Sequence, residues 1–281
     1  MKFVTMSGLP RAGTTLLANV LNQHPDITAE MDSSLSMLIT GISGHAAKVF
    51  EDSPRTMKEL KVLYTSFMRS GMSGWISKIC DTSVYLDKDR GWAVDFDLLF
   101  NIVPSTKVIF PVRDLRGIIS SFEKLETVDR ITPPSTEELF SFESRDDYHG
   151  VDLMEHKVKS YMEGDMIYTP LFALKEYLDS NRSHLDNFHF VRYEDFIESP
   201  RDALSKIYNF IGIDNFENNL DNIEQAPFRD AHFYPWGDHT IKKTLKPKKQ
   251  TYEFPLIKEE TQEFILREYS WYYEKFYPEL L

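Results

Sequence analysis

Short apolar runs alternate along this chain with polar loops and with apolar residues at helical spacing. Residues 3–6 form one such run, 107–112 a second and 188–192 a third, and each has the length and composition of a buried strand. After the first run and a loop rich in glycine and proline, apolar residues return with the period of a helix at positions 16, 17, 20 and 21. Repeated strand–loop–helix units predict an α/β fold, with a mostly parallel sheet of four or five strands between helices.

Other segments are less regular. Ser199, Pro200 and Gly212 predict the N-cap, first turn and end of a helix after the third run. Residues 83–86 predict a short further strand, while 151–180 and 260–277 predict amphipathic helices, the second with an aromatic stripe that we assign to packing. Residues 26–75 show weak helical periodicity and should wrap the acceptor side of a site. Residues 127–150, with a Pro-Pro pair and dense charge, predict a surface insertion or lid within a single domain spanning 1–281.

Composition fits a globular enzyme. With 281 residues of which 42% are apolar, the chain can bury a large core in one domain. Its 44 acidic and 32 basic side chains give a formal charge of −12, which argues against a nucleic-acid partner or an anionic membrane surface. Cys80 is the single cysteine, so internal disulfides are excluded. No apolar run has membrane-spanning length and no signal peptide precedes the first strand, so we expect a cytoplasmic protein.

The loop after the first strand has the features of a phosphate site. Gly8 and Gly13 have the separation of the glycines in a Walker A loop, and a helix start directly after them aims free backbone N–H groups at an anion. The usual Walker lysine is replaced by Thr14, and the nearest cation is Arg11, inside the loop. The pattern therefore predicts phosphate binding and disfavours a nucleoside triphosphatase.

This segment resembles the sulfotransferases that use 3′-phosphoadenylyl sulfate (PAPS), most closely the branch containing the tyrosylprotein sulfotransferases. The matching string is Pro-Arg-Ala-Gly-Thr-Thr-Leu at 10–16, followed by His-Pro at 24–25. The resemblance implies that the 5′-phosphosulfate is held by the loop and the first helical turn, at Arg11, Ala12, Gly13, Thr14, Thr15 and Leu16.

Three later segments extend the resemblance. Arg113, at the end of the second run, and Ser121, eight residues on, match the family's motif for the 3′-phosphate, where a guanidinium fork and a hydroxyl suit a phosphate well. Tyr193, in the string Arg-Tyr-Glu-Asp, matches a tyrosine that contacts the nucleotide, although an amphipathic core position explains it equally well. Lys246, followed by proline, matches a lysine that closes over the cofactor phosphates.

Sulfuryl transfer needs a base, a cation on the leaving phosphate and an acceptor in line with sulfur. The resemblance implies a carboxylate base shortly after the His-Pro pair, and Glu30 and Asp32 are the candidates. The distance from His24 along the chain favours Asp32, whereas the longer side chain favours Glu30. The choice stays open, with a preference for Glu30. Lys88, 25 residues before Arg113, matches the family's leaving-group lysine, and Arg11 is expected to stabilise charge as well as bind.

The predicted reaction uses PAPS as donor, releases 3′-phosphoadenosine 5′-phosphate (PAP) and needs no metal. The acceptor is a hydroxyl or amine of a small molecule or peptide, and no motif identifies it or the oligomeric state. His239 is a weak candidate for base or acceptor contact. Two alternatives remain: a catalytically inactive nucleotide-binding module, and a P-loop kinase, for which Asp114 is the obvious Mg²⁺ ligand.

Overall fold

A single parallel sheet forms the centre of the protein. The computed structural model describes residues 1–281 except 32, 129–157, 159–160, 165–166, 181–183 and 227–239. The sheet has five strands in the order β2-β3-β1-β4-β5, and all four ladders are parallel. All carboxyl ends therefore lie at one edge, where ligands bind in open α/β sheets. The strands are β1 (Lys2–Met6), β2 (Ile27–Glu30), β3 (Val84–Lys88), β4 (Lys107–Val112) and β5 (Phe188–Arg192).

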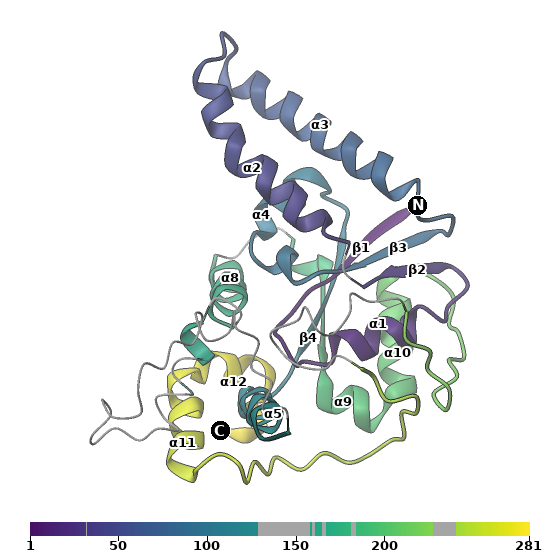
Figure 1. The fold of residues 1–281 in the computed structure, drawn as a ribbon, viewed down its shortest axis with the longest axis vertical. Helices are drawn as coiled ribbons and strands as arrows, with labels where there is room; N and C mark the ends of the chain where they lie inside the picture. The colour runs from purple at the N-terminus through teal and green to yellow at the C-terminus, as the bar shows by residue number, and fades with distance from the viewer. Residues whose placement is uncertain (32, 129–157, 159–160, 165–166, 181–183, 227–239) are drawn as a thin grey trace.

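Helices cover both faces of this sheet (Figure 1). Side chains alternate along each strand, so Ile109 of β4 packs in one core cluster while its neighbours Val108 and Phe110 pack in the other. The face that carries Ile109 is covered by α1 (Thr14–Leu21), α9 (Tyr193–Glu198) and α10 (Pro200–Ile211). The opposite face meets α2 (Leu35–Glu51), α3 (Met57–Ile76), α4 (Phe96–Ile102), α5 (Leu115–Val128), α8 (Tyr168–Asp179), α11 (Glu259–Glu268) and α12 (Ser270–Phe276).

The helices α2 and α3 form a long hairpin that projects beyond the sheet at the top of Figure 1. A capping box begins α3, in which Thr56 and Glu59 satisfy each other's backbone N–H groups. Four residues of α3, Leu60, Met68, Met72 and Ile76, are buried at helical spacing. One face of the hairpin thus belongs to the core, while its outer part has few neighbours.

The predicted fold class is confirmed, and so are the three principal strands. Pro200 and Gly212 begin and end α10 as expected, with Gly212 at φ 78°, but the Ser199 side chain makes no capping hydrogen bond. The predicted strand at 83–86 in fact extends to Lys88, and the predicted helix at 260–277 is divided at Tyr269 into α11 and α12. Strand β2 was not predicted, because its four residues mix apolar and polar side chains.

Two predictions concern segments that are only partly described. In 151–180 the described part contains α8, and the proposed insertion at 127–150 begins too early, since α5 continues to Val128. Residues 129–150 lie outside the described residues, so the lid and the domain limits of 1–281 stay predictions.

Candidate active site

A sharp loop joins β1 to α1 at the carboxyl edge of the sheet. A Cβ on Gly8 would lie 2.7 Å from the carbonyl oxygen of Pro111, so only glycine lets β1 and β4 approach this closely. Arg11 has a φ of 59° and Gly13 a φ of 81°, both in the left-handed region. A non-glycine residue held there is strained, and such strain clusters at ligand-binding sites.

The loop leads into the start of α1, which has the features of an anion site. Gly13 is the N-cap, and Leu17 N–H is the first to donate back into the turn, to Gly13 O at 3.0 Å. The N–H groups of Thr14, Thr15 and Leu16 precede it and have no partner within the helix. These amides and the positive end of the helix dipole suit a phosphate or sulfate group.

The two predicted phosphate motifs meet in space. Arg11 Nε donates to Ser121 Oγ at 3.0 Å, and Arg113 Nη1 donates to the carbonyl oxygen of Arg11 at 2.7 Å. None of the ion pairs among the described residues includes Arg113. Two guanidinium groups are therefore gathered beside the helix start of an otherwise acidic protein.

Tyr193, the first residue of α9, completes this cluster. The Arg113 guanidinium carbon lies 4.4 Å from the centre of the Tyr193 ring, and a Cβ on Gly13 would lie 2.6 Å from Tyr193 Cδ2. The half-buried ring thus lies between the two motifs and also packs against the core cluster on the α1 face of the sheet. Segments 10–16 and 113–121 and Tyr193 thus lie together at the start of α1, and their role in binding a nucleotide stays a prediction.

A layer of buried tyrosines from α12 fixes the backbone of the second motif. The Tyr272 hydroxyl accepts from Arg113 N–H at 3.2 Å and donates to Arg113 C=O at 2.9 Å. The Tyr273 hydroxyl donates to Asp114 Oδ1 at 2.9 Å. Burial raises the pKa of both tyrosines, which keeps these hydroxyls protonated. The sequence predicts packing for this aromatic stripe but gives no sign of the hydrogen bonds that its hydroxyl groups make.

Asp114, the residue that a kinase mechanism would assign to Mg²⁺, is already engaged. It is fully buried and accepts from Arg116 Nε at 3.1 Å and Nη2 at 2.6 Å, in addition to Tyr273. Both carboxylate oxygens thus have partners inside the protein. Among the described residues, no group of three or more His, Cys, Asp or Glu side chains is arranged to hold a metal ion.

The catalytic candidates lie at the same edge of the sheet. Lys88 ends β3 opposite Met6 of β1, and Glu30 ends β2 opposite Asp87 of β3. Lys88 is buried, and strand alternation directs the Glu30 and Lys88 side chains to opposite faces of the sheet. Asp32 lies outside the described residues, so the assignment of the base stays a prediction.

A buried carboxylate between these candidates escaped the sequence analysis. Asp87 Oδ2 accepts from Ser33 Oγ at 2.9 Å and from Trp92 Nε1 at 3.0 Å, while Oδ1 has no hydrogen-bond partner among the described residues. Burial raises the Asp87 pKa to about 7, the charge of Asp89 adds to the rise, and the two hydrogen bonds oppose it. The only sequence signal was an acidic residue directly after a predicted strand.

The late basic segment lies beside α9. Leu245 is buried and its N–H donates to Leu220 O at 2.7 Å, while Lys248 N–H donates to Ile197 O at 3.2 Å. Lys246 itself is exposed. His239 lies outside the described residues. The backbone of residues 245–248 thus lies beside α9, the helix that begins with Tyr193. The role of Lys246 stays a prediction.

Comparison with known proteins decides the family. A profile described as the sulfotransferase family matches residues 4–218. The chain belongs to the sulfotransferase family. The matched range includes both phosphate motifs, Lys88 and Tyr193. Membership of the branch that contains the tyrosylprotein sulfotransferases stays a prediction.

Solved structures agree on the fold of this sulfotransferase. The sulfotransferase domain from the curacin biosynthetic pathway shares 16% identity over 96% of this chain and 97% of its own, with a TM-score of 0.56. The sulfotransferase domain of the olefin synthase from Synechococcus PCC 7002 shares 17% identity over 96% and 94%, with a TM-score of 0.51. No curated protein sequence matches the chain. In the described part of the chain, no helix is long and apolar enough to cross a membrane.

Proposed function

We propose that this sulfotransferase transfers a sulfuryl group from PAPS to a hydroxyl group of an acceptor, by in-line displacement with a carboxylate as general base. The base, Glu30 or Asp32, takes the acceptor proton as the acceptor oxygen forms a bond to sulfur. The bond from sulfur to the phosphate oxygen breaks, and PAP departs with that electron pair. Lys88 and Arg11 stabilise the charge that develops on the departing phosphate.

One observation carries the proposal: Arg11, Arg113 and Ser121 meet at the start of α1. A nucleotide with phosphates at its 5′ and 3′ positions needs two anion sites a short distance apart. The amides after Gly13 suit one phosphate, and the Arg113 guanidinium and the Ser121 hydroxyl, each of which contacts Arg11, suit the other. ATP lacks the 3′-phosphate and would leave that second pair unused.

Calorimetry with PAP and with ATP tests the proposal. We expect PAP to bind more tightly than ATP and without a requirement for Mg²⁺. Arg113→Ala should lose a charge-assisted contact of about 1.5–3 kcal/mol and so weaken PAP binding by roughly ten- to a hundredfold. Arg201→Ala is the matched control, since Arg201 is exposed and pairs only with the exposed Glu217 in the described structure.

Equal affinities, or ATP binding that depends on Mg²⁺, would contradict the PAPS site and favour a kinase. Transfer of labelled sulfate from PAPS to a panel of phenols, peptides, sugars and alcohols then separates an enzyme from an inactive binding module. A protein that binds PAP tightly and sulfates no member of the panel would support the binding module.

A further inference from the structure

Helix α2 is apolar on two sides, and only one of them is used by the core. Leu35 and Ile39 are buried in the core. On the outer side Met37 is 70% exposed, Leu38 46% and Ile42 41%. Isolated exposed apolar residues are ordinary, but a contiguous row of them marks a surface that binds something.

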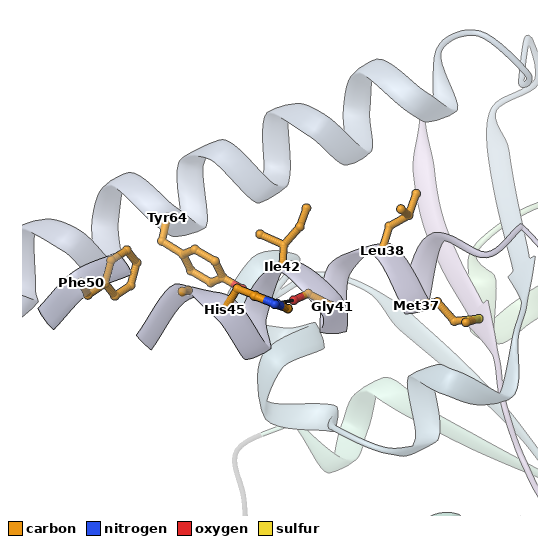
Figure 2. A pocket seen from close by; sticks show the side chains of 8 residues that line it. Met37, Leu38, Gly41, Ile42, His45, Phe50 and Tyr64 are labelled. Atoms are coloured by element: carbon orange, nitrogen blue, oxygen red, sulfur yellow. Dashed lines mark hydrogen bonds between the residues drawn. The ribbon is translucent and has the colours of Figure 1, made fainter. Parts of the chain in front are cut away.

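This row lines a groove of about 520 Å³ along α2, to which α3 contributes Tyr64 (Figure 2). Phe50 of α2 and Tyr64 of α3 meet edge to face, with ring centres 5.8 Å apart, at the end remote from Met37. The size is that of a small-molecule site. No carboxylate, ammonium or guanidinium group is among the lining side chains, and the single imidazole, His45, lies 3.0 Å from the carbonyl oxygen of Gly41 through its Nδ1.

The groove begins at the edge of the sheet where transfer is proposed. Ser33 Oγ donates to Asp87 at 2.9 Å and Ser36 Oγ donates to Asp89 at 2.6 Å, so the start of α2 is tied to the residues on either side of Lys88. Met37 follows Ser36 directly. From Met37 to Phe50 the helix rises by about 20 Å, so the groove leads from this edge outward along the hairpin.

We propose that the groove holds the alkyl chain of an amphiphilic acceptor whose hydroxyl group lies at the carboxyl edge of the sheet. This inference rests on the proposed function. The uncharged walls offer nothing to a charged peptide and few hydrogen-bonding groups to a sugar, whereas they bury methylene groups favourably. The alcohol oxygen gains the sulfuryl group and loses its proton to the base, and the chain itself takes no part in the chemistry.

A series of primary alcohols from 1-butanol to 1-dodecanol tests the groove. Each methylene that enters it should raise kcat/KM by about fourfold, until the groove is filled. Gly41→Leu should flatten this dependence on chain length. A Cβ on Gly41 meets no atom within 4 Å, so the new side chain occupies groove space without a clash.

Gly44→Leu is the matched control. Gly44 lies on the same helix, also has nothing within 4 Å of a Cβ, and does not line the groove. It should retain the chain-length dependence of the wild type. Affinity for PAP reports whether each variant is folded. Displacement of anilinonaphthalene sulfonate by 1-dodecanol measures the groove without catalysis, and Gly41→Leu alone should weaken it.

The outcomes separate the two proposals. Transfer to 1-butanol and 1-dodecanol with equal kcat/KM would overturn the groove assignment and leave the proposed function intact. Tight PAP binding without transfer to any acceptor would overturn the proposed function, while probe displacement would still decide the groove. If Gly41→Leu instead abolished a dimer in sedimentation, or binding to phosphatidylcholine vesicles, the groove would be an interface and the acceptor assignment wrong.

Discussion

Replacement of Asp87 by asparagine should change how the stability of the protein depends on pH. Burial raises the pKa of the Asp87 carboxyl from its ordinary value of 3.8 to about 7 in the folded state. The folded protein therefore holds this proton more tightly than the unfolded chain does. The resulting stabilisation is fully present below about pH 4 and is lost as the pH rises through 7.

The size of the effect follows from that difference. At about 1.4 kcal/mol for each pKa unit, the wild type loses about 4 kcal/mol between the two values. Asparagine cannot ionise. Its amide nitrogen would stand in place of Oδ1 of Asp87, which has no hydrogen-bond partner among the described residues. An unsatisfied buried group costs about 1–3 kcal/mol. The variant should therefore be less stable than the wild type near pH 4 by about 1–3 kcal/mol and more stable near pH 8 by a similar amount.

Urea unfolding of both proteins at intervals from about pH 4 to about pH 8 measures this crossover. The difference between the two free energies of unfolding isolates Asp87 from the other titrating groups. Asp186→Asn, at an exposed position, is the matched control and should show no crossover. A difference between wild type and Asp87→Asn that stays constant across the range would refute the reasoning.

Four further substitutions test the site. Glu30→Gln should lower kcat by roughly 10²–10⁴ and leave PAP affinity nearly unchanged; the same loss in Asp32→Asn, with Glu30→Gln near wild type, would transfer the role of base. Lys88→Ala should lower the whole pH profile of kcat/KM, whereas loss of the base should remove its acidic limb; an unchanged profile would exclude a role for this lysine. Tyr272→Phe removes a hydroxyl that holds both backbone groups of Arg113 and should weaken PAP binding about three- to tenfold in calorimetry. Unchanged affinity would show that the loop is held without it.

The principal strands and the phosphate motifs could be predicted because their signals are local. An apolar run, a glycine loop and a helical repeat are written in consecutive residues, as in 3–21 and 107–121. Strand β2 could not be predicted in this way. Its four residues, 27–30, pair with β3 more than fifty residues away, and only that pairing makes them a strand.

The hydrogen bonds that hold the Arg113 loop in place could not be predicted from the sequence either. Tyr272 and Tyr273 lie about 160 residues from the Arg113–Asp114 loop that their hydroxyls hold. In sequence they are two aromatic residues of an amphipathic helix; the packing role predicted for the stripe that includes Tyr272 is confirmed, and Tyr273 was not part of that prediction. The hydrogen bond from Arg11 to Ser121 could not be predicted either, because it depends on how the loop after β1 lies relative to α5.

Because α12 holds the Arg113 loop in place, this loop gains its support only late during synthesis on the ribosome. The phosphate motifs emerge early, at 10–16 and 113–121, but the tyrosines that fix Arg113 and Asp114 emerge some 150 residues after Ser121. Chains fold from the N-terminus as they are made. A nascent chain that has completed its sheet at β5 thus still lacks the hydroxyl groups that hold Arg113 and Asp114, and we expect the proposed nucleotide site to form only after 270–277 arrive. We expect removal of that short helix to weaken the proposed site without altering any residue of its motifs.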